Sequence, residues 1–323
     1  MKQILKLLGF ALGLALLVSA VVHFVRSQAA LPARPKTFEI IAHRGVHQTF
    51  PLSNLENDTC TAARIGPPEH HFLENTIPSI AEAFKDGATM VELDIQRTRD
   101  NQMVVFHDWG LDCRTNGHGI THDQPVAELK KLDIAYGYTA DNGKTFPLRG
   151  DGIGIMPTLE EVFATFPNQR LLVQQKDRDI RTAETFAAIV EKLSAEQQRQ
   201  LYWFGPTEMQ AVLQQRIPDV MNLFPSAGQM RQCGKSVFMR LGFGDLPPSC
   251  RLNSILLPAR YLWMVPGWPN DFLQKAAKAR VPVYVMDVDT MAEAETLTKL
   301  PLHGIMTNKI ETIGPFLRQA SSR

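Results

Sequence analysis

Short apolar segments alternate with amphipathic segments along most of the chain. Apolar runs of only a few residues, rich in Val, Ile, Leu and Met, are typical of buried strands. The predicted strands lie at 38–42, 90–95, 103–106, 170–175, 201–204, 220–224, 253–257, 282–288 and 304–306. Between them, apolar residues recur at helical spacing, as at Ile77, Ile80 and Phe84. The predicted helices lie at 76–87, 126–132, 159–166, 183–193, 208–215, 271–279 and 291–299.

The alternation of strands and helices favours parallel strands joined by right-handed crossovers. About eight such units over some 280 residues indicate an α/β fold, a closed TIM (β/α)8 barrel more than an open doubly wound sheet. A glycine-rich dinucleotide fingerprint is absent, because Gly242 and Gly244 follow no clear strand and lack a third glycine. We expect the barrel to span 37–323, with a polar, glycine-rich excursion at 111–154.

The first 26 residues do not continue this alternation. Residues 7–25 carry no formal charge, and a helix of these 19 residues nearly spans a hydrocarbon core of about 30 Å. Its place behind two lysines is typical of an export signal, and a buried core helix is the less favoured alternative. A small-x-small cleavage site follows, although the apolar run is longer than in most signal peptides. We therefore expect a signal-anchor or signal peptide at 1–26 and a linker at 27–36.

Either kind of signal exports the barrel, which is then membrane-anchored through the N-terminal helix or free in the periplasmic or extracellular space. Four cysteines in an exported protein permit two disulfides in three connectivities. The simplest pairing joins Cys60 to Cys113 and Cys233 to Cys250. Four free buried thiols are an equally open alternative.

Composition and charge narrow the classes of protein and partner. Hydrophobic residues make up 44% of the chain and charged residues 21%, which excludes wholesale disorder. The 34 basic and 33 acidic residues leave a net charge of +1, which argues against nucleic acid as a partner. The G-x-S-x-G elbow of many serine hydrolases is absent. Nothing in the sequence predicts the oligomeric state.

Histidines and charged side chains gather at the ends of the predicted strands. His43 and Arg44 end the first strand, His107 and Asp108 the third, and Lys176 the fourth. Because parallel barrel strands open their carboxyl ends on one face, we expect these side chains to meet there. Two histidines suit acid–base catalysis, and an arginine and a lysine suit an anion such as phosphate. Each histidine taken singly could also be structural.

Glu92 and Asp94 lie two residues apart on the second predicted strand, so both side chains point to the same face. Two ionised carboxylates side by side in a barrel repel each other and lose solvation, and a hard divalent cation such as Ca²⁺ or Mg²⁺ offsets both costs. A polar face on an edge strand is the alternative, but a closed barrel has no edge strand.

These residues belong to stretches that resemble the glycerophosphodiester phosphodiesterase family. The matching stretches are His43-Arg44-Gly45, Glu74-Asn75-Thr76, Glu92-Leu93-Asp94 and His107-Asp108, with weaker matches at 111–119 and 157–161. The resemblance covers about 38–176 well and the remainder loosely. It implies a TIM barrel with a small insertion after the third strand, here 111–154. It also implies a phosphoric diester hydrolase that uses one divalent cation to convert glycerophosphodiesters to glycerol 3-phosphate and an alcohol.

The resemblance also implies roles for individual residues. His43 and His107 correspond to the acid and the base, in an order that the sequence does not decide. Glu92 and Asp94 correspond to metal ligands. Glu74 and Asn75 correspond to residues that shape the substrate site, which Arg44 and Lys176 are expected to complete.

Three departures from the family pattern bear on activity. Gln174 occupies the position of a third metal carboxylate, so metal affinity should fall. Asp289 stands where the family has Asn, in Met286-Asp-Val-Asp289, and Asn308 stands where it has Asp, in Gly304-Ile-Met-Thr-Asn308. A catalytically degenerate barrel that binds a ligand or lipid in the cell envelope is therefore the alternative function.

The apolar and aromatic segment 259–272 bears on the substrate. It could line an acyl pocket or dip toward a bilayer, although ordinary loop packing is the commoner use of such a segment. With the N-terminal helix, it makes a lipid-derived phosphodiester, such as a lysophospholipid, a reasonable substrate beside the small glycerophosphodiesters. A related barrel enzyme that cleaves sphingolipid or lysolipid head groups is a third hypothesis.

Overall fold

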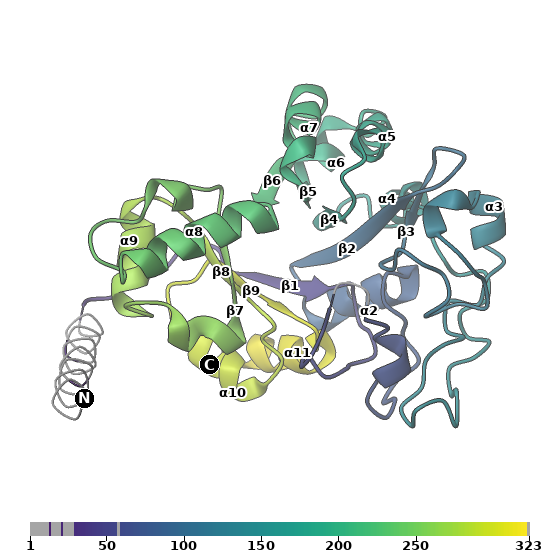
Figure 1. Ribbon diagram of the computed structural model, residues 1–323, viewed down its shortest axis with the longest axis horizontal. Helices are drawn as coiled ribbons and strands as arrows, with labels where there is room; N and C mark the ends of the chain where they lie inside the picture. The colour runs from purple at the N-terminus through teal and green to yellow at the C-terminus, as the bar shows by residue number, and fades with distance from the viewer. Residues whose placement is uncertain (1–12, 14–20, 22–28, 57–58, 322–323) are drawn as a thin grey trace, which may run out of the picture.

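The computed structural model describes residues 29–56 and 59–321, together with Gly13 and Val21 (Figure 1). The predicted signal or anchor helix at 1–26 therefore lies, apart from two positions, outside the described residues. Among the residues that are described, no helix is long and apolar enough to cross a membrane. The end of the expected linker contacts the barrel, because the Arg34 guanidinium donates to the Lys299 carbonyl at 2.7 Å.

Eight parallel strands curve into a nearly closed barrel in the order β6-β5-β4-β2-β1-β9-β8-β7, which confirms the predicted TIM fold (Figure 1). Strand β1 pairs with β2 on one side and with β9 on the other, so the first and last strands lie side by side. The bounds are β1 Glu39–His43, β2 Met90–Arg97, β4 Leu171–Gln175, β5 Leu201–Phe204, β6 Met221–Phe224, β7 Ile255–Pro258, β8 Val283–Met286 and β9 Gly304–Thr307.

The predicted strand at 103–106 is not a barrel strand, and counting it as the third parallel strand was wrong. It forms β3 (Met103–Val105), which pairs antiparallel with the end of β2, with Ile95 opposite Val105. The physical reason is the length of the connection. Only residues 98–102 separate the two strands, whereas a parallel crossover needs a dozen or more. The third parallel strand is therefore β4.

The barrel has one seam, between β6 and β7. Over the described length of both strands they share no backbone ladder, and they stand at the two ends of the sheet order. Two side chains bridge the seam near its start. The Asn253 amide donates to the Asn222 carbonyl at 3.1 Å, and the Ser254 hydroxyl donates to the Leu223 carbonyl at 2.6 Å.

Helices surround the strands, and several begin at a capping box, in which the N-cap side chain and the third helical residue bond each other's backbone N–H groups. They are α2 Ile77–Asp86, α3 Val126–Leu129, α4 Leu159–Thr165, α5 Ile180–Val190, α6 Ala195–Arg199, α7 Gln210–Arg216, α8 Ala227–Met239, α9 Asn270–Lys278, α10 Met291–Thr298 and α11 Ile310–Ser321. Short 3₁₀ turns are η1 Ala62–Arg64, η2 Thr121–Asp123, η3 Thr207–Met209, η4 Pro248–Cys250 and η5 Ala259–Met264.

The sequence pattern did not predict the short helix α6, nor α8 or α11. Two glycines and many polar residues weaken the apolar periodicity of α8, and Pro315 lies inside α11. Tertiary packing stabilises α8 and α11, because Cys233 and Val237 bury one face of α8, and Ile313 and Leu317 bury one face of α11.

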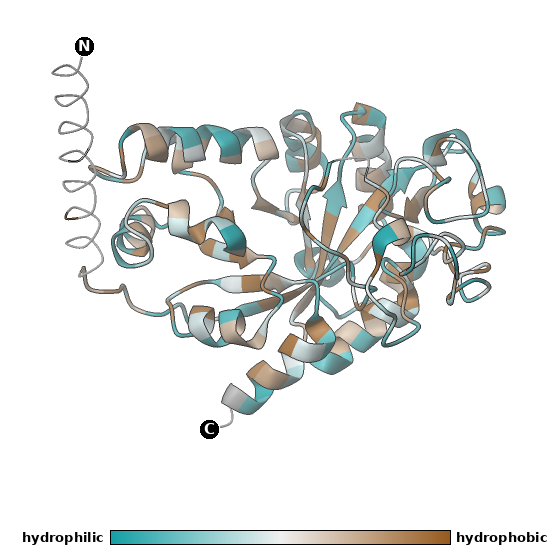
Figure 2. Ribbon diagram, turned by 60° about the horizontal axis from the view of Figure 1, so that its bottom comes forward, coloured by the Kyte–Doolittle hydropathy of each residue, from teal (hydrophilic) through white to brown (hydrophobic). Residues whose placement is uncertain are grey.

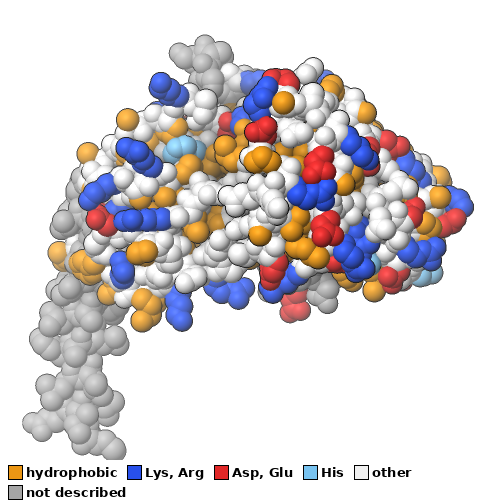
Figure 3. All heavy atoms as spheres, turned by 90° about the horizontal axis from the view of Figure 1, so that it is seen from above, with side chains coloured by type: hydrophobic (Ala, Val, Ile, Leu, Met, Phe, Trp, Pro, Cys, Tyr) orange, Lys and Arg blue, Asp and Glu red, His pale blue; other side chains and the backbone are white. Residues whose placement is uncertain are grey.

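The core has two layers. Inside the barrel, Ile41, Met90, Leu172, Phe224 and Met306 pack together. Outside it, apolar residues of the helices pack against the outer faces of the strands in two larger clusters. Hydrophobic residues predominate along the central strands and mix with hydrophilic ones on the surrounding helices (Figure 2). On the side of α7 and α8, basic and acidic side chains are interspersed, in keeping with the small net charge (Figure 3).

Both predicted disulfides are present. Cys60 pairs with Cys113, and Cys233 pairs with Cys250. The first joins the irregular segment that follows β1 to the predicted insertion at 111–154. The second joins α8 to η4. The first disulfide thus fastens two segments that follow the carboxyl ends of β1 and β3, whereas the second ties α8 to the segment that leads into β7.

Candidate active site

A cavity of about 1800 Å³ opens at the carboxyl ends of the barrel strands. Five of the predicted site residues line it: His43, Arg44, His107, Gln174 and Lys176. The other four, Glu74, Asn75, Glu92 and Asp94, are buried and do not line it, but they contact residues that do. The structure therefore brings all nine predicted residues to one end of the barrel.

His43, at the end of β1, is held by Asn308. The His43 Nδ1 lies 2.6 Å from the Asn308 Oδ1, and the Asn308 amide nitrogen donates to the Asp289 carboxylate at 2.9 Å. Because the amide nitrogen is engaged by Asp289, the amide oxygen faces His43, and we assign the ring proton to Nδ1. Burial and the adjacent Arg44 charge lower the pKa of His43 well below its usual value. His43 is therefore a neutral imidazole with an available Nε2.

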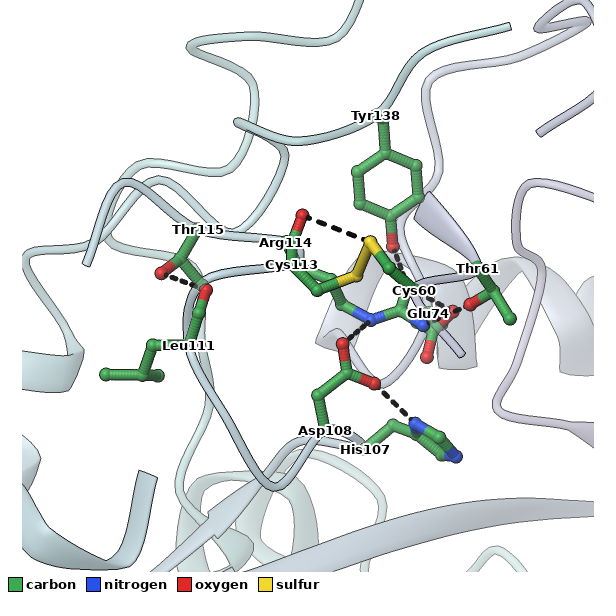
Figure 4. Close-up of a disulfide and its surroundings, with 10 residues drawn as sticks. All are labelled: Cys60, Thr61, Glu74, His107, Asp108, Leu111, Cys113, Arg114, Thr115 and Tyr138. Carbon is green, nitrogen blue, oxygen red and sulfur yellow. Dashed lines mark hydrogen bonds and ion pairs between the residues drawn. A yellow bond between two sulfur atoms is a disulfide. The ribbon is translucent and has the colours of Figure 1, made fainter. Parts of the chain in front are cut away.

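His107, directly after β3, is held by a carboxylate instead. Its Nδ1 lies 2.6 Å from the Asp108 Oδ1, and the other Asp108 oxygen accepts from the Arg114 Nε at 2.7 Å (Figure 4). Burial and the Arg44 charge lower the pKa of His107, while Asp94 and Asp108 oppose the shift. The antiparallel return of β3 thus brings this histidine to the same cavity as His43.

Arg114 is a functional residue that sequence reasoning missed, because it stood only within a weakly matching segment. It is 2% exposed, and its guanidinium donates to the Glu74 carboxylate at 2.8 Å, to the Tyr138 hydroxyl at 2.6 Å and to the Thr61 hydroxyl at 2.6 Å (Figure 4). Thr61 directly follows one disulfide cysteine, and Arg114 directly follows the other. The Cys60–Cys113 disulfide therefore positions both the Arg114 guanidinium and the Thr61 hydroxyl that accepts from it.

Asp94 is surrounded by partners. Its Oδ1 lies 3.1 Å from the Lys176 Nζ, and its Oδ2 lies 3.2 Å from the Arg44 Nε. The Asn75 amide donates to Oδ2 at 3.0 Å and accepts from the Asp94 backbone N–H at 3.0 Å. Burial alone would raise the pKa of Asp94, but the Lys176 and Arg44 charges bring it well below its usual value. Asp94 is therefore ionised.

Glu92 is fully buried and has fewer hydrogen-bond and ion-pair partners than Asp94. Its Oε2 accepts from the Arg44 backbone N–H at 3.2 Å and lies 3.8 Å from the His43 Nε2. Its Oε1 has no hydrogen-bond partner among the described residues. Burial and the neighbouring Asp94 charge raise the pKa of Glu92 well above its usual value. Ionised Glu92 therefore needs a further cation.

Arg44 is a structural bridge at the turn after β1. Its guanidinium binds Glu74 at 3.0 Å as well as Asp94. The turn itself depends on glycine, because Gly45 has a φ of +78° and a Cβ there would lie 2.9 Å from the Ser79 backbone. This explains why glycine follows the histidine and arginine.

Glu92, Asp94 and Gln174 are the side chains available to hold the divalent cation that the family resemblance implies. No group of three or more His, Cys, Asp or Glu that could hold a metal ion occurs in the described parts of the chain. Asp94 and Gln174 are partners in the β2–β4 register, however, and Glu92 occupies the preceding same-face position of β2. Two carboxylates and an amide oxygen are hard ligands that suit Ca²⁺ or Mg²⁺, and the buried Glu92 Oε1 lacks a partner. The residues present therefore fit such an ion.

Comparisons with known proteins agree with this arrangement. The family model described as "Glycerophosphoryl diester phosphodiesterase family" matches residues 43–312. A glycerophosphodiester phosphodiesterase of Caldanaerobacter subterraneus subsp. tengcongensis is 26% identical over 248 residues, which cover 76% of this chain and 93% of that protein. Glycerophosphodiester phosphodiesterase 1 of Homo sapiens is 36% identical over 104 residues, 32% of this chain and 29% of that protein.

Solved structures share the fold. The crystal structure of a glycerophosphodiester phosphodiesterase from Agrobacterium tumefaciens aligns with a TM-score of 0.60 at 20% identity, over 86% of this chain and 99% of that one. An Oleispira antarctica phosphodiesterase aligns with a TM-score of 0.56 at 18% identity, over 88% of this chain and 97% of that one. With the family model matching most of its length, this chain belongs to the glycerophosphoryl diester phosphodiesterase family and is a phosphoric diester hydrolase.

Proposed function

We propose that the enzyme hydrolyses glycerophosphodiesters to glycerol 3-phosphate and an alcohol, with His43 and His107 as the catalytic pair and one divalent cation. The observation that carries the proposal is that the two histidines lie in similar surroundings. Each holds a partner at Nδ1, 2.6 Å away, and each lines the same cavity. The Oleispira antarctica relative was solved with the product sn-glycerol-3-phosphate, which supports this substrate class.

The partners of the two histidines suggest an order of roles. Asp108 is a carboxylate, so it stabilises a protonated His107 once the substrate is bound. Asn308 is a neutral amide, and the pKa of His43 is held well below its usual value by burial and Arg44. We therefore assign His43 as the base that deprotonates the attacking oxygen. His107 is the acid that protonates the leaving alcohol.

Charge balance supports the cation. The charges of Arg44, Arg114 and Lys176 are balanced by those of Glu74, Asp94 and Asp108, so ionising Glu92 as well leaves these groups with a net charge of −1. A phosphodiester also carries −1 and would be repelled. Glu92, Asp94 and Gln174 are the residues that would hold a divalent cation. When bound, it would reverse the sign of the site and stabilise the charge on the phosphoryl oxygens.

Lys176 and Arg44 complete the substrate site. Lys176 is partly exposed to the cavity and contacts Asp94 with one edge of its ammonium group. Arg44 is buried and pairs with Glu74 and Asp94, so it fixes the carboxylates and adds positive potential. In this proposal Lys176 contacts the phosphate directly and Arg44 acts mainly by positioning. No observation favours the alternative of a degenerate binding protein.

We also propose that the enzyme works outside the cytoplasm, exported by the N-terminal segment and either released or anchored by it. The two disulfides support this setting, because disulfides persist in oxidising compartments. The uncharged run at 7–25 supports it independently.

The test is glycerol 3-phosphate release from glycerophosphocholine by the full-length protein, made with its disulfides formed, in Ca²⁺, Mg²⁺ or chelator. The matched variants are Glu92→Gln, which removes the buried charge, and Glu82→Gln, which removes a carboxylate on the outer face of α2. We expect chelator and Glu92→Gln each to reduce turnover at least on the order of 10²-fold, with Glu82→Gln unchanged. Full turnover in chelator and in Glu92→Gln would overturn the metal-dependent proposal.

A further inference from the structure

The cavity is larger than a small diester requires. Its volume of about 1800 Å³ exceeds the roughly 300–1000 Å³ of most small-molecule pockets. Beyond the catalytic residues, it continues along β6, β7 and α8 toward η5. This part of the cavity, the side arm, is lined chiefly by Phe224, Val237, Phe238, Tyr261, Met264 and β7.

The side arm passes through the seam of the barrel. Ile255, Leu256, Leu257 and Pro258, four consecutive residues of β7, all line the cavity. Successive side chains of a strand point to opposite faces, so a cavity that touches all four must pass around the edge of β7. That edge is free for passage because β6 and β7 share no ladder over their described lengths.

The walls of the side arm are apolar on both sides of the seam. Phe204, Phe224 and Met286 line it from the barrel interior, and Val237 and Phe272 line it from the layer beneath α8. At such walls a hydrocarbon gains free energy by leaving water, whereas a choline group would lose the hydration of its charge and a glycerol or sugar group would lose hydrogen bonds.

The outer mouth of the side arm is also apolar. Phe238 is 60% exposed, Tyr261 48% and Met264 51%, and all three line the cavity. Two arginines, Arg231 and Arg260, lie on the same rim. An apolar opening with cations at its edge suits a chain drawn from a lipid aggregate with an anionic surface.

We propose that the side arm holds the hydrocarbon chain of a monoacyl glycerophospholipid whose phosphodiester lies at His43 and His107. This inference rests on the proposed function and names its substrate class. In the reaction, the phosphorus–oxygen bond to the head-group alcohol breaks and the alcohol leaves with a proton. Water supplies the oxygen that phosphorus gains, its second proton passes to solvent, and a monoacyl glycerol 3-phosphate remains.

The first experiment needs no variant. Head-group release is measured for glycerophosphocholine and for lysophosphatidylcholines with chains of 6, 8 and 10 carbons, all below their micelle concentrations. As the side arm fills, we expect kcat/KM to rise by up to roughly fourfold for each methylene buried. A value of kcat/KM that is independent of chain length would overturn the inference.

The second experiment blocks the side arm. Gly234, on α8, lines the cavity, and a Cβ built there meets no atom within 4 Å, so the side chain of Gly234→Trp starts without a clash and adds bulk at the cavity wall. The control is Lys235→Trp, because Lys235 adjoins it on α8 but lies on a different groove. We expect Gly234→Trp to lower kcat/KM for the 10-carbon substrate at least tenfold and to leave glycerophosphocholine within twofold. Equal losses for both substrates, or none for either, would contradict a chain in the side arm.

The two proposals fail in different ways. Absence of glycerophosphocholine turnover by the folded wild-type protein in every metal would contradict the proposed function. Turnover of glycerophosphocholine with no gain from longer chains would leave that function standing and overturn only the side-arm inference.

Discussion

The guanidinium of Arg114 lies 2.7 Å from the carboxylate of Asp108, measured from Nε to Oδ2. The same carboxylate holds His107 with its other oxygen, so an arginine from the insertion orients a histidine that follows β3. Glu74 binds the far side of Arg114 and also Arg44. The insertion is thus connected to the barrel turn after β1 through a continuous chain of buried charges.

Replacing Arg114 should therefore affect stability and catalysis together. Arg114→Met leaves Asp108 and Glu74 buried with one cationic partner fewer, so we expect the free energy of unfolding to fall by about 3–5 kcal/mol. Urea unfolding measures this. The catalytic readout is the pH profile of kcat, because loss of Arg114 raises the pKa of Asp108 and alters the titration of His107. Arg99→Met, at an exposed arginine, is the control. A wild-type urea midpoint for Arg114→Met would contradict the structural role.

The two histidines should respond differently to the leaving group. His107→Ala should reduce turnover of glycerophosphocholine by on the order of 10²–10⁴-fold, because choline alkoxide leaves poorly without a proton. It should largely spare a p-nitrophenyl diester, whose phenolate leaves unprotonated. His43→Ala should slow both substrates.

Steady-state kinetics on both diesters tests these assignments, with His71→Ala as the control at an exposed histidine. The opposite pattern would exchange the acid and the base. Equal losses for both substrates in both variants would remove the distinction between them.

Asp289 and Asn308 are hydrogen-bonded to each other, so the carboxylate and the amide should be exchangeable only when both residues are replaced together. The Asn308 amide nitrogen donates to Asp289 at 2.9 Å, and its backbone N–H donates to the same carboxylate at 2.8 Å. Asn308→Asp alone places two carboxylates in contact, so we expect a loss of about 1–3 kcal/mol in the free energy of unfolding. Adding Asp289→Asn should restore most of it. A double-mutant cycle measures the coupling, and additive losses would show that the two residues are independent.

Stability should fall with rising pH because of Glu311. Burial, with smaller contributions from Asp86 and Asp289, raises its pKa from 4.5 to about 7, and its Oε2 is buried without a hydrogen-bond partner. An acid whose pKa is higher in the folded state stabilises the fold fully below pH 4.5 and loses that contribution as pH rises through about 7. The loss should be about 2–3 kcal/mol, since the side chain is partly exposed.

Urea unfolding at several pH values between 4 and 8 measures this slope in the wild type and in Glu311→Gln. The variant should be less dependent on pH and more stable than the wild type at pH 8. An unchanged slope in Glu311→Gln would assign the pH dependence to other groups.

The barrel could be predicted because strands buried on both faces appear as short apolar runs. The position of His43 and His107 at the cavity could be predicted because both residues lie at the ends of such runs. The apolar pattern did not reveal that β3 runs antiparallel to β2. That direction follows from the connection 98–102, which is too short for a parallel crossover. Helix α8 was missed because its stability comes from packing and from Cys233, which bonds to Cys250, rather than from periodicity.

The parts of the site that were missed depend on contacts between distant segments. Arg114 and Tyr138 come from the insertion, where no periodic pattern marks a buried ion pair. Asp289 and Asn308 each departed from the family pattern when considered alone. The structure places them in contact, so the pair keeps one carboxylate and one amide with their positions exchanged. Single positions in a sequence do not reveal such compensation.

The seam between β6 and β7 has a consequence for how the chain is completed during synthesis. Because that edge lacks a ladder, β7, β8 and β9 join the rest of the sheet only through the pairing of β9 with β1. Strand β1 keeps one open edge until nearly the whole polypeptide has emerged, because its second neighbour is β9. Since β6 gives β7 no ladder, no earlier pairing holds β7 and β8 to the rest of the sheet. A nascent chain that stops before Gly304 would present the open edge of β1 and a separate β7–β8 pair, and such edges are sites for aggregation and for chaperone binding.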